Sequence, residues 1–246
     1  MIRHLHLLFI LLVPFGTMAQ EINGDWILKR VDEIRGSENK ISVAVMNIKG
    51  KRGDRSVKSK SYIHGMTRSY TEYLAPARDA GTKMLKLEDQ LWTYSPATDR
   101  TILISGHLLR QSVMGSDLSY EDLMEDPRLS NLYSARITGE ENILGSRCWM
   151  LQLDSRVPDI TSYSRKVWVD QERFVILRED RYAKSGKLLK TTEVLTVEQI
   201  EARWIATRVR FKDVLKTGEG TEFAIESIEF NADIPEYIFT KAVLKK

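Results

Sequence analysis

Most of this chain is a succession of strand-like segments separated by turns, and this feature constrains the fold more than any other. From Lys40 to Phe230, β-branched and aromatic residues gather in short segments, and turn signals recur about every ten residues. The turns at 184–187 and 217–220 are clear hairpin connections between long strands. This spacing is typical of an antiparallel meander. Because a sheet of this size normally curls, we expect about eleven strands in one antiparallel sheet with a concave face.

One short helix interrupts the strand series, in the stretch from Gln90 to Pro127. A hairpin comes first, and Ser119 can then cap a helix that has Asp122 at its third position and ends before the proline. Other acidic residues of this helix, such as Glu125, are interpreted as solvated. The apolar face must be buried against the sheet that the helix interrupts, so we predict a lid. This face is formed by Leu118, Leu123 and Met124.

A second helix is predicted before the first strand. Asn23 can cap it, Gly36 can close it, and its apolar residues share one face that must also lie on an apolar surface. The segment 234–239 is predicted to be a single helical turn on the sheet edge. The expected fold class is therefore mainly β (α+β), a curled sheet whose concave face is covered by the N-terminal helix and the mid-chain lid helix.

The N-terminal residues 1–19 have the pattern of a secretory signal peptide. Arg3 precedes a short apolar run, and small residues stand before the predicted cleavage position. The run is shorter than the ~20 apolar residues that a membrane span needs. We therefore expect residues 20–246 to form a single domain outside the cytosol, without an integral membrane segment.

Composition and motifs argue against several classes of function. The formal net charge of +3, with both signs interspersed, gives no nucleic-acid footprint. Beyond the signal only His64 and His107 remain, and neither has neighbours at ligand spacing, so no metal or other cofactor is expected. In an enzyme, Ser112 or Ser116 would be the nucleophile that pairs with His107, although no Gly-x-Ser-x-Gly elbow is present. The single cysteine, Cys148, is expected to be a core residue.

Methionine and aromatic residues on the strands and the lid are the remaining signal. Methionine adapts to irregular apolar ligands, and an apolar lid over a curled sheet can enclose a lipid-type cavity. Each residue taken singly is also explained as core, and a one-residue change of register would move a strand residue to the other face. The candidate ligand-binding residues are Met84, Trp92, Tyr94, Met114, Leu118, Leu123, Met124, Trp149 and Trp168.

Three motifs of the chain resemble the outer-membrane lipoprotein-sorting (LolA-like) family. They are LWTYSP at 91–96, SVMGSDLSYEDL at 112–123 and, near the C-terminus, IPE at 234–236. The order of a signal, a helix, a meander, a lid and further hairpins is also similar, and the resemblance covers essentially the whole chain after the signal. It implies an incomplete antiparallel barrel closed by helices.

The resemblance also implies a function. Such a protein would be a monomeric periplasmic carrier that takes the acyl chains of a lipid or lipoprotein into the half-barrel. Its partners would be an inner-membrane exporter and an outer-membrane acceptor. Carriers of this family have an arginine that locks the lid, and Arg68 and Arg110 are the candidates by position.

Two other functions stay open at the level of the sequence. An envelope sensor or scaffold could bind a segment of a partner protein on the same half-barrel, as an added strand or a helix in the groove. An enzyme would depend on the serine and histidine pair described above. The cargo itself is not specified by any motif.

Overall fold

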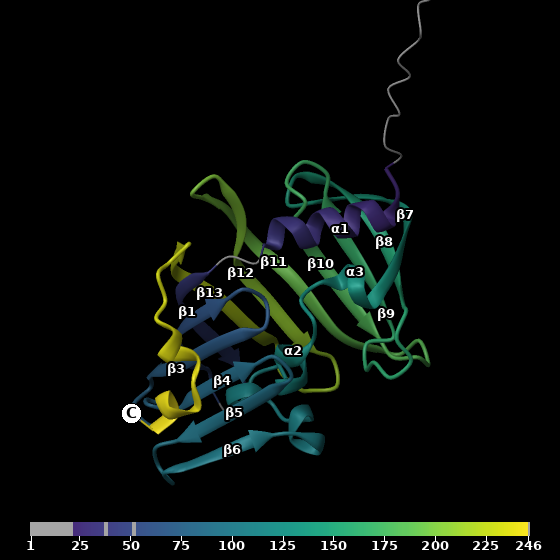
Figure 1. The fold of residues 1–246 in the computed structure, drawn as a ribbon. Coiled ribbons are helices and arrows are strands. Elements are labelled where there is room, and N and C mark those ends of the chain that lie inside the picture. The colour runs from purple at the N-terminus through teal and green to yellow at the C-terminus, as the bar shows by residue number, and fades with distance from the viewer. Residues whose placement is uncertain (1–21, 37–38, 51–52, 246) are drawn as a thin grey trace, which may run out of the picture.

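The computed structural model describes residues 22–36, 39–50 and 53–245. Its dominant feature is one strongly curved, open, 13-stranded antiparallel sheet (Figure 1). Register shifts in several strand pairs add bends that favour this curvature. The predicted signal peptide lies outside the described residues.

The sheet has more strands than the expected number of about eleven. The hairpin predicted before the lid helix adds its two strands, β5 and β6, to the edge of the same sheet. The strands are β1 (Lys40–Lys49), β2 (Arg55–His64), β3 (Arg68–Ala75), β4 (Lys83–Leu87), β5 (Gln90–Ser95), β6 (Arg100–Ile104), β7 (Tyr133–Ile143), β8 (Ser146–Ser155), β9 (Ser164–Asp170), β10 (Ile176–Tyr182), β11 (Leu188–Ile200), β12 (Arg203–Asp213) and β13 (Gly220–Phe230). The helices are α1 (Gly24–Arg35), α2 (Tyr120–Met124) and α3 (Leu129–Leu132), with 3₁₀ turns η1 (Gly106–Arg110), η2 (Val113–Gly115), η3 (Glu236–Phe239) and η4 (Lys241–Lys245).

The strand order explains why a helical segment crosses the sheet. Strands β1 to β6 and β7 to β13 form two meanders, which join where β1 pairs with β13. The strands β6 and β7 therefore lie at opposite edges of the sheet. The chain between them, residues 105–132, must cross from one edge to the other, and it crosses on the concave face (Figure 1).

Helix α1 covers one end of the concave face. Asn23 caps it by accepting a hydrogen bond from the amide of Trp26 at 3.0 Å, and Gly36 ends it with a φ of 63°. Both caps confirm the prediction. The carboxylate of Asp25 accepts a hydrogen bond from the amide of Ala135 at 2.7 Å, which fixes the helix to the edge strand β7. The buried side chains of α1 that pack with β8 and β9 are Ile27, Leu28 and Val31.

The C-terminal turns pack on the convex face, whereas the sequence predicted the sheet edge. Val243 and Leu244 are buried against residues of β3, β4 and β5. The tail reaches this face because β13, which precedes it, lies beside β1 in the interior of the strand order. The strand residues that it covers include Tyr70, Leu85 and Trp92.

Residues 105–124 cover the other end of the concave face. Helix α2 begins after Ser119, as predicted, and has the capping box formed with Asp122. Beneath this segment lies a buried apolar cluster from the first meander. Its strand members are Met46, Ile48, Val57, Tyr73, Met84, Leu91 and Ile104.

Candidate functional site

The segment before α2 is tied to the second meander by hydrogen bonds. The hydroxyl of Ser112 accepts a hydrogen bond from Lys216 Nζ at 2.6 Å. The buried Asp117 accepts hydrogen bonds from the Thr221 hydroxyl and from the amide of Asp213, each at 2.9 Å. The polar residues of the 112–123 motif therefore anchor the crossing segment to β12 and β13.

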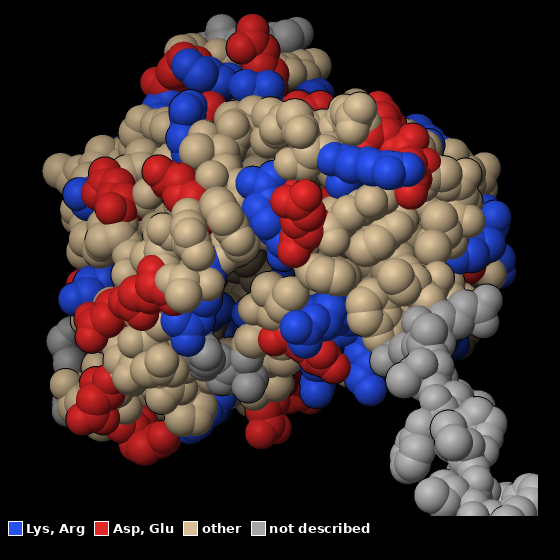
Figure 2. All heavy atoms as spheres, turned by 90° about the horizontal axis from the view of Figure 1, so that it is seen from above, with Lys and Arg blue, Asp and Glu red and all other residues tan. Residues whose placement is uncertain are grey.

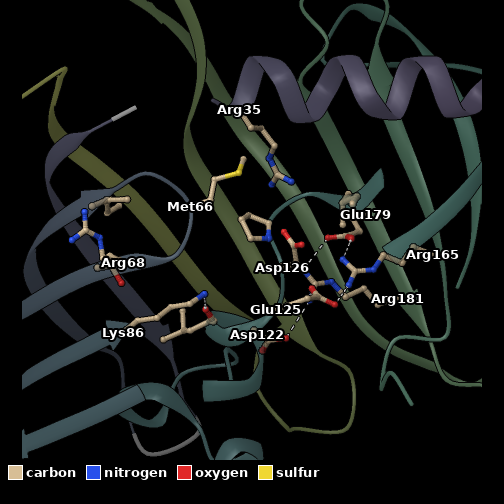
Figure 3. Close-up of a pocket in the computed structure, with 15 residues that line it drawn as sticks. Arg35, Met66, Arg68, Lys86, Asp122, Glu125, Asp126, Arg165, Glu179 and Arg181 are labelled. Atoms are coloured by element: carbon tan, nitrogen blue, oxygen red, sulfur yellow. Dashed lines mark hydrogen bonds and ion pairs between the residues drawn. The ribbon is translucent and has the colours of Figure 1, made fainter. Parts of the chain in front are cut away.

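Three cationic side chains form a row beneath α2, across β9, β10 and β11. Arg165, Arg181 and Lys190 stand directly opposite one another in the register. Like charges in this arrangement destabilise a sheet, so the row needs anions. Helix α2 supplies two of them: Asp122 pairs with Arg181 at 3.2 Å and with Lys190, and Glu125 pairs with Arg165 (Figure 3).

The centre of this ion-pair network is Arg165, whose side chain is 1% exposed. It pairs with Glu179 at 2.6 Å, and its guanidinium lies over the ring of Tyr133 at 4.7 Å. Glu179 also accepts a hydrogen bond from Arg181 at 3.1 Å. The carboxylates of α2 thus close a charge arrangement that the strands leave incomplete.

The network keeps its carboxylates ionised. Burial by itself would raise the pKa of Glu179, but Arg181 and Arg165 outweigh burial and lower this pKa to about 2. Burial likewise opposes ionisation of Asp122, and Lys190 and Arg181 lower its pKa below the usual range. At neutral pH, α2 is therefore held to the sheet by charged pairs.

A cavity of about 520 Å³ lies between α1 and the concave face. A second cavity of about 330 Å³ lies beside α2, and both are lined by Arg35, Ile63, Met66 and Pro127 (Figure 3). The larger cavity is mainly apolar, whereas the smaller is lined by the ion-pair network. Apolar residues of the larger cavity include Val31, Ile34, Ile176, Phe223, Ile225 and Phe230.

The structure brings together six of the nine residues predicted from the sequence on the concave side. Met84, Met114, Leu118, Leu123 and Met124 belong to the cluster beneath the crossing segment. Trp149 packs beneath α1. None of the nine lines the larger cavity, whose apolar residues come from α1 and strands that the sequence analysis did not single out.

Three of the predicted residues lie on the convex face and line neither cavity. Trp92 and Tyr94 pack beneath the C-terminal turns. Trp168 packs with Cys148, and its ring lies between Lys166 and Arg178. The reason is the alternation of side chains along a strand: Trp92 and Tyr94 are out of phase with Leu91, which faces α2.

Helix α2, the predicted lid, is contacted by different arginines from the two that the sequence proposed. Arg68 pairs with Glu236 of the C-terminal segment at 2.8 Å. Arg110 ends η1 and makes no ion pair within the described residues. Arg181 pairs with Asp122 of α2, and Arg165 pairs with Glu125, which follows this helix directly. The sequence signal for these contacts was a pair of carboxylates, Asp122 and Glu125, on a helical segment that had to be buried and would therefore need cationic partners.

The serine candidates have structural contacts. Ser112 bonds to Lys216, and the amide of Leu118 donates a hydrogen bond to the Ser116 hydroxyl at 3.2 Å. Cys148 is buried, as expected for a core residue, and burial raises the pKa of its thiol to about 11.

Two further findings concern the described part of the chain. It contains no group of three or more His, Cys, Asp or Glu side chains placed to hold a metal ion. Its helices are all too short or too polar to cross a membrane. On the face shown in Figure 2, cationic and anionic side chains are interspersed.

Comparison with known proteins identifies the family and the fold. A family model described as a family of uncharacterized proteins matches residues 65–246. A DUF1329 family protein from Desulfovibrio piger is 26% identical, with a TM-score of 0.82 over 90% of this chain and 97% of that chain. A putative outer membrane lipoprotein-sorting protein domain from Vibrio parahaemolyticus is 24% identical, with a TM-score of 0.79 over 91% and 98%. A LolA superfamily protein from Nitrosomonas europaea is 23% identical, with a TM-score of 0.73 over 91% and 100%. No curated protein matches the chain.

Proposed function

This chain belongs to the family of uncharacterized proteins whose model matches residues 65–246, and it has the LolA-like fold; from this premise we propose that it is a carrier of acyl chains. The fold supports a carrier or binding role in general. The cargo in our proposal is a lipid or a lipoprotein, held between α1, α2 and the concave face of the sheet.

The observation that carries this proposal is the apolar cavity of about 520 Å³ beneath α1. Its volume falls within the roughly 300–1,000 Å³ that ligand pockets occupy. Burying a methylene group stabilises a complex by about 0.8 kcal/mol, so a cavity of this lining would shield acyl chains from water effectively. The methionines beneath the crossing segment can adapt to chains of different length.

Release of the cargo would require α2 to move. Lifting the helix removes Asp122 and Glu125 from the row of three cations and leaves like charges opposite one another. The lid would therefore stay closed in the free carrier and open when an acceptor supplies compensating contacts.

We further propose that the carrier acts in the periplasm, after removal of residues 1–19. It would receive its cargo from an inner-membrane exporter and deliver it to an outer-membrane acceptor. Supporting observations are the N-terminal sequence pattern and the fold shared with a putative outer membrane lipoprotein-sorting domain.

Native mass spectrometry with lipid extraction tests the proposal on protein purified from a periplasmic extract. We expect an additional bound mass that extraction identifies as a diacyl lipid or a lipoprotein. Empty protein that also ignores added acyl-chain probes would contradict the carrier role. Recovery of a stoichiometric protein without lipid would favour the alternative, a sensor or scaffold.

A further inference from the structure

The charged groups of the smaller cavity are unequally satisfied. Every carboxylate that lines it has a cationic partner: Asp122, Glu125 and Glu179 belong to the ion-pair network, and Asp126 pairs with Arg128 at 3.4 Å. Asp126 also accepts a hydrogen bond from Asn131 at 2.8 Å. The cavity therefore has no unpaired negative charge to offer a cationic ligand.

Two of its cations form no direct ion pair within the described residues: Glu179 attracts Arg35, and Asp126 attracts Lys86, only from beyond contact distance. The side chain of Arg35 makes no hydrogen bond with any described residue, and it projects from the end of α1 (Figure 3). Lys86 donates a hydrogen bond only to the backbone oxygen of Leu123, at 2.8 Å. In addition, the Nε atoms of Arg165 and Arg181 are buried without a hydrogen-bond partner. These groups are donors that a negatively charged ligand would satisfy.

The position of Arg35 connects this unsatisfied positive charge to the apolar cavity. Arg35 lines both cavities, so its guanidinium stands where the apolar lining ends and the charged lining begins. Lys86 faces the same space from β4. Burial lowers the pKa of Lys86, and a bound anion would offset that effect.

We propose that the cargo is an amphiphile with an anionic head group next to its acyl chain. The chain lies in the apolar cavity beneath α1, and the head group, a phosphate or a carboxylate, binds at Arg35 and Lys86. This inference rests on the proposed carrier function and specifies its ligand class. A neutral lipid would fill the same apolar cavity and leave both cations unpaired.

The test compares ligands that differ only in the anionic group. Palmitoyl lysophosphatidic acid and monopalmitoyl glycerol carry the same chain, and each is used to displace a fluorescent acyl-chain probe from the full mature chain. We expect the phosphate to strengthen binding about tenfold, which is the lower range for hydrogen bonds to charged groups. Palmitate tests the carboxylate, and inorganic phosphate alone should displace no probe.

Two variants locate the effect. Arg35→Gln should remove most of the preference for the anionic ligand while the affinity for monopalmitoyl glycerol stays within about twofold. Arg30→Gln is the control, because Arg30 lies on the same helix and pairs with the exposed Glu33 at 3.1 Å. Lys86→Met should also reduce the preference.

Each other outcome has a definite meaning. Equal affinity for the two ligands, or equal weakening of both by Arg35→Gln, would overturn the anionic head group and leave the carrier function standing. Inorganic phosphate binding as tightly as the phospholipid would show an anion site independent of the acyl chain, which also overturns the inference. Failure of all acyl ligands to bind would overturn the carrier function together with it.

Discussion

Arg165 is the residue on which the contact between the strands and the segment around α2 depends. Its buried guanidinium compensates Glu179 on β10 and Glu125 on the crossing segment. A neutral side chain of similar length would fill the space and leave both carboxylates near one another. The stability lost in such a variant would therefore be electrostatic, with little contribution from packing.

We expect Arg165→Met to lower the free energy of unfolding by about 3–5 kcal/mol, the usual cost of leaving a buried charge without its partner. Equilibrium denaturation in urea measures the change. Arg136→Met is the matched control, because Arg136 forms an exposed pair with Asp154 at 3.7 Å and should contribute less than about 1 kcal/mol. Equal losses in the two variants would contradict the central place of Arg165.

The pH dependence of stability follows from Glu179. Because its pKa in the folded state, about 2, lies below the ordinary value of 4.5, it stabilises the fold above the ordinary value. This contribution is lost as the pH falls from about 4.5 to 2, and it amounts to roughly 3 kcal/mol. Unfolding midpoints of the wild type should fall across this window, and Glu179→Gln should flatten the fall. If the unfolding midpoint of the variant fell equally steeply, the pH dependence of stability would come from other carboxylates.

For single residues, the sequence predicts that a side chain is buried better than it predicts the face of the sheet on which that side chain lies. Leu123 and Met124 were placed correctly because the capping box of α2 is local and sets the phase of the helix. Trp92 and Trp168 were misplaced because the face of a strand residue depends on register, which distant partners determine. The row from Arg165 to Lys190 was missed for the same reason.

Among the elements, α2 is the one whose motion the proposed function requires. It is a short helix with no buried residue of its own. Short isolated helices are marginal in water, so its position depends on the ion pairs and on the cap. Its freedom to move should therefore respond to single charge changes that leave the sheet intact.

We expect Glu125→Gln to increase the amide exchange of residues 120–124 by about tenfold, because it weakens the charged hydrogen bond to Arg165 without touching the N-terminal capping box. Hydrogen exchange followed by mass spectrometry measures this. Glu121→Gln is the control on the same helix, since Glu121 accepts a hydrogen bond only from the exposed Thr161. Unchanged exchange in Glu125→Gln would show that the apolar contacts of α2 are sufficient to hold it.

For the whole molecule, local signals predict the two meanders and long-range pairing completes the sheet. Each hairpin is visible in the sequence through its turn. The pairing of β1 with β13 joins segments from opposite ends of the chain, and no local pattern marks it. That pairing puts β6 and β7 at opposite edges, and so requires residues 105–132 to cross the concave face. The position of α2 is thus a consequence of topology, whereas its helical form is a consequence of local sequence.

The same topology makes the cavity a property of the joined sheet, because its lining comes from α1 and from both sides of the β1–β13 seam.

Ser42, on β1 at this seam, lines the cavity. We expect Ser42→Phe to occupy part of the space and weaken acyl-chain probe binding by about tenfold or more, while the thermal midpoint changes little because the cavity is open. Val43→Phe is the control, since adjacent residues of a strand point to opposite faces. Probe titration and thermal unfolding of both variants give the comparison. Undiminished binding in a folded Ser42→Phe protein would place the ligand elsewhere, because an aromatic ring and an acyl chain cannot fill the same volume at the packing density of a protein interior.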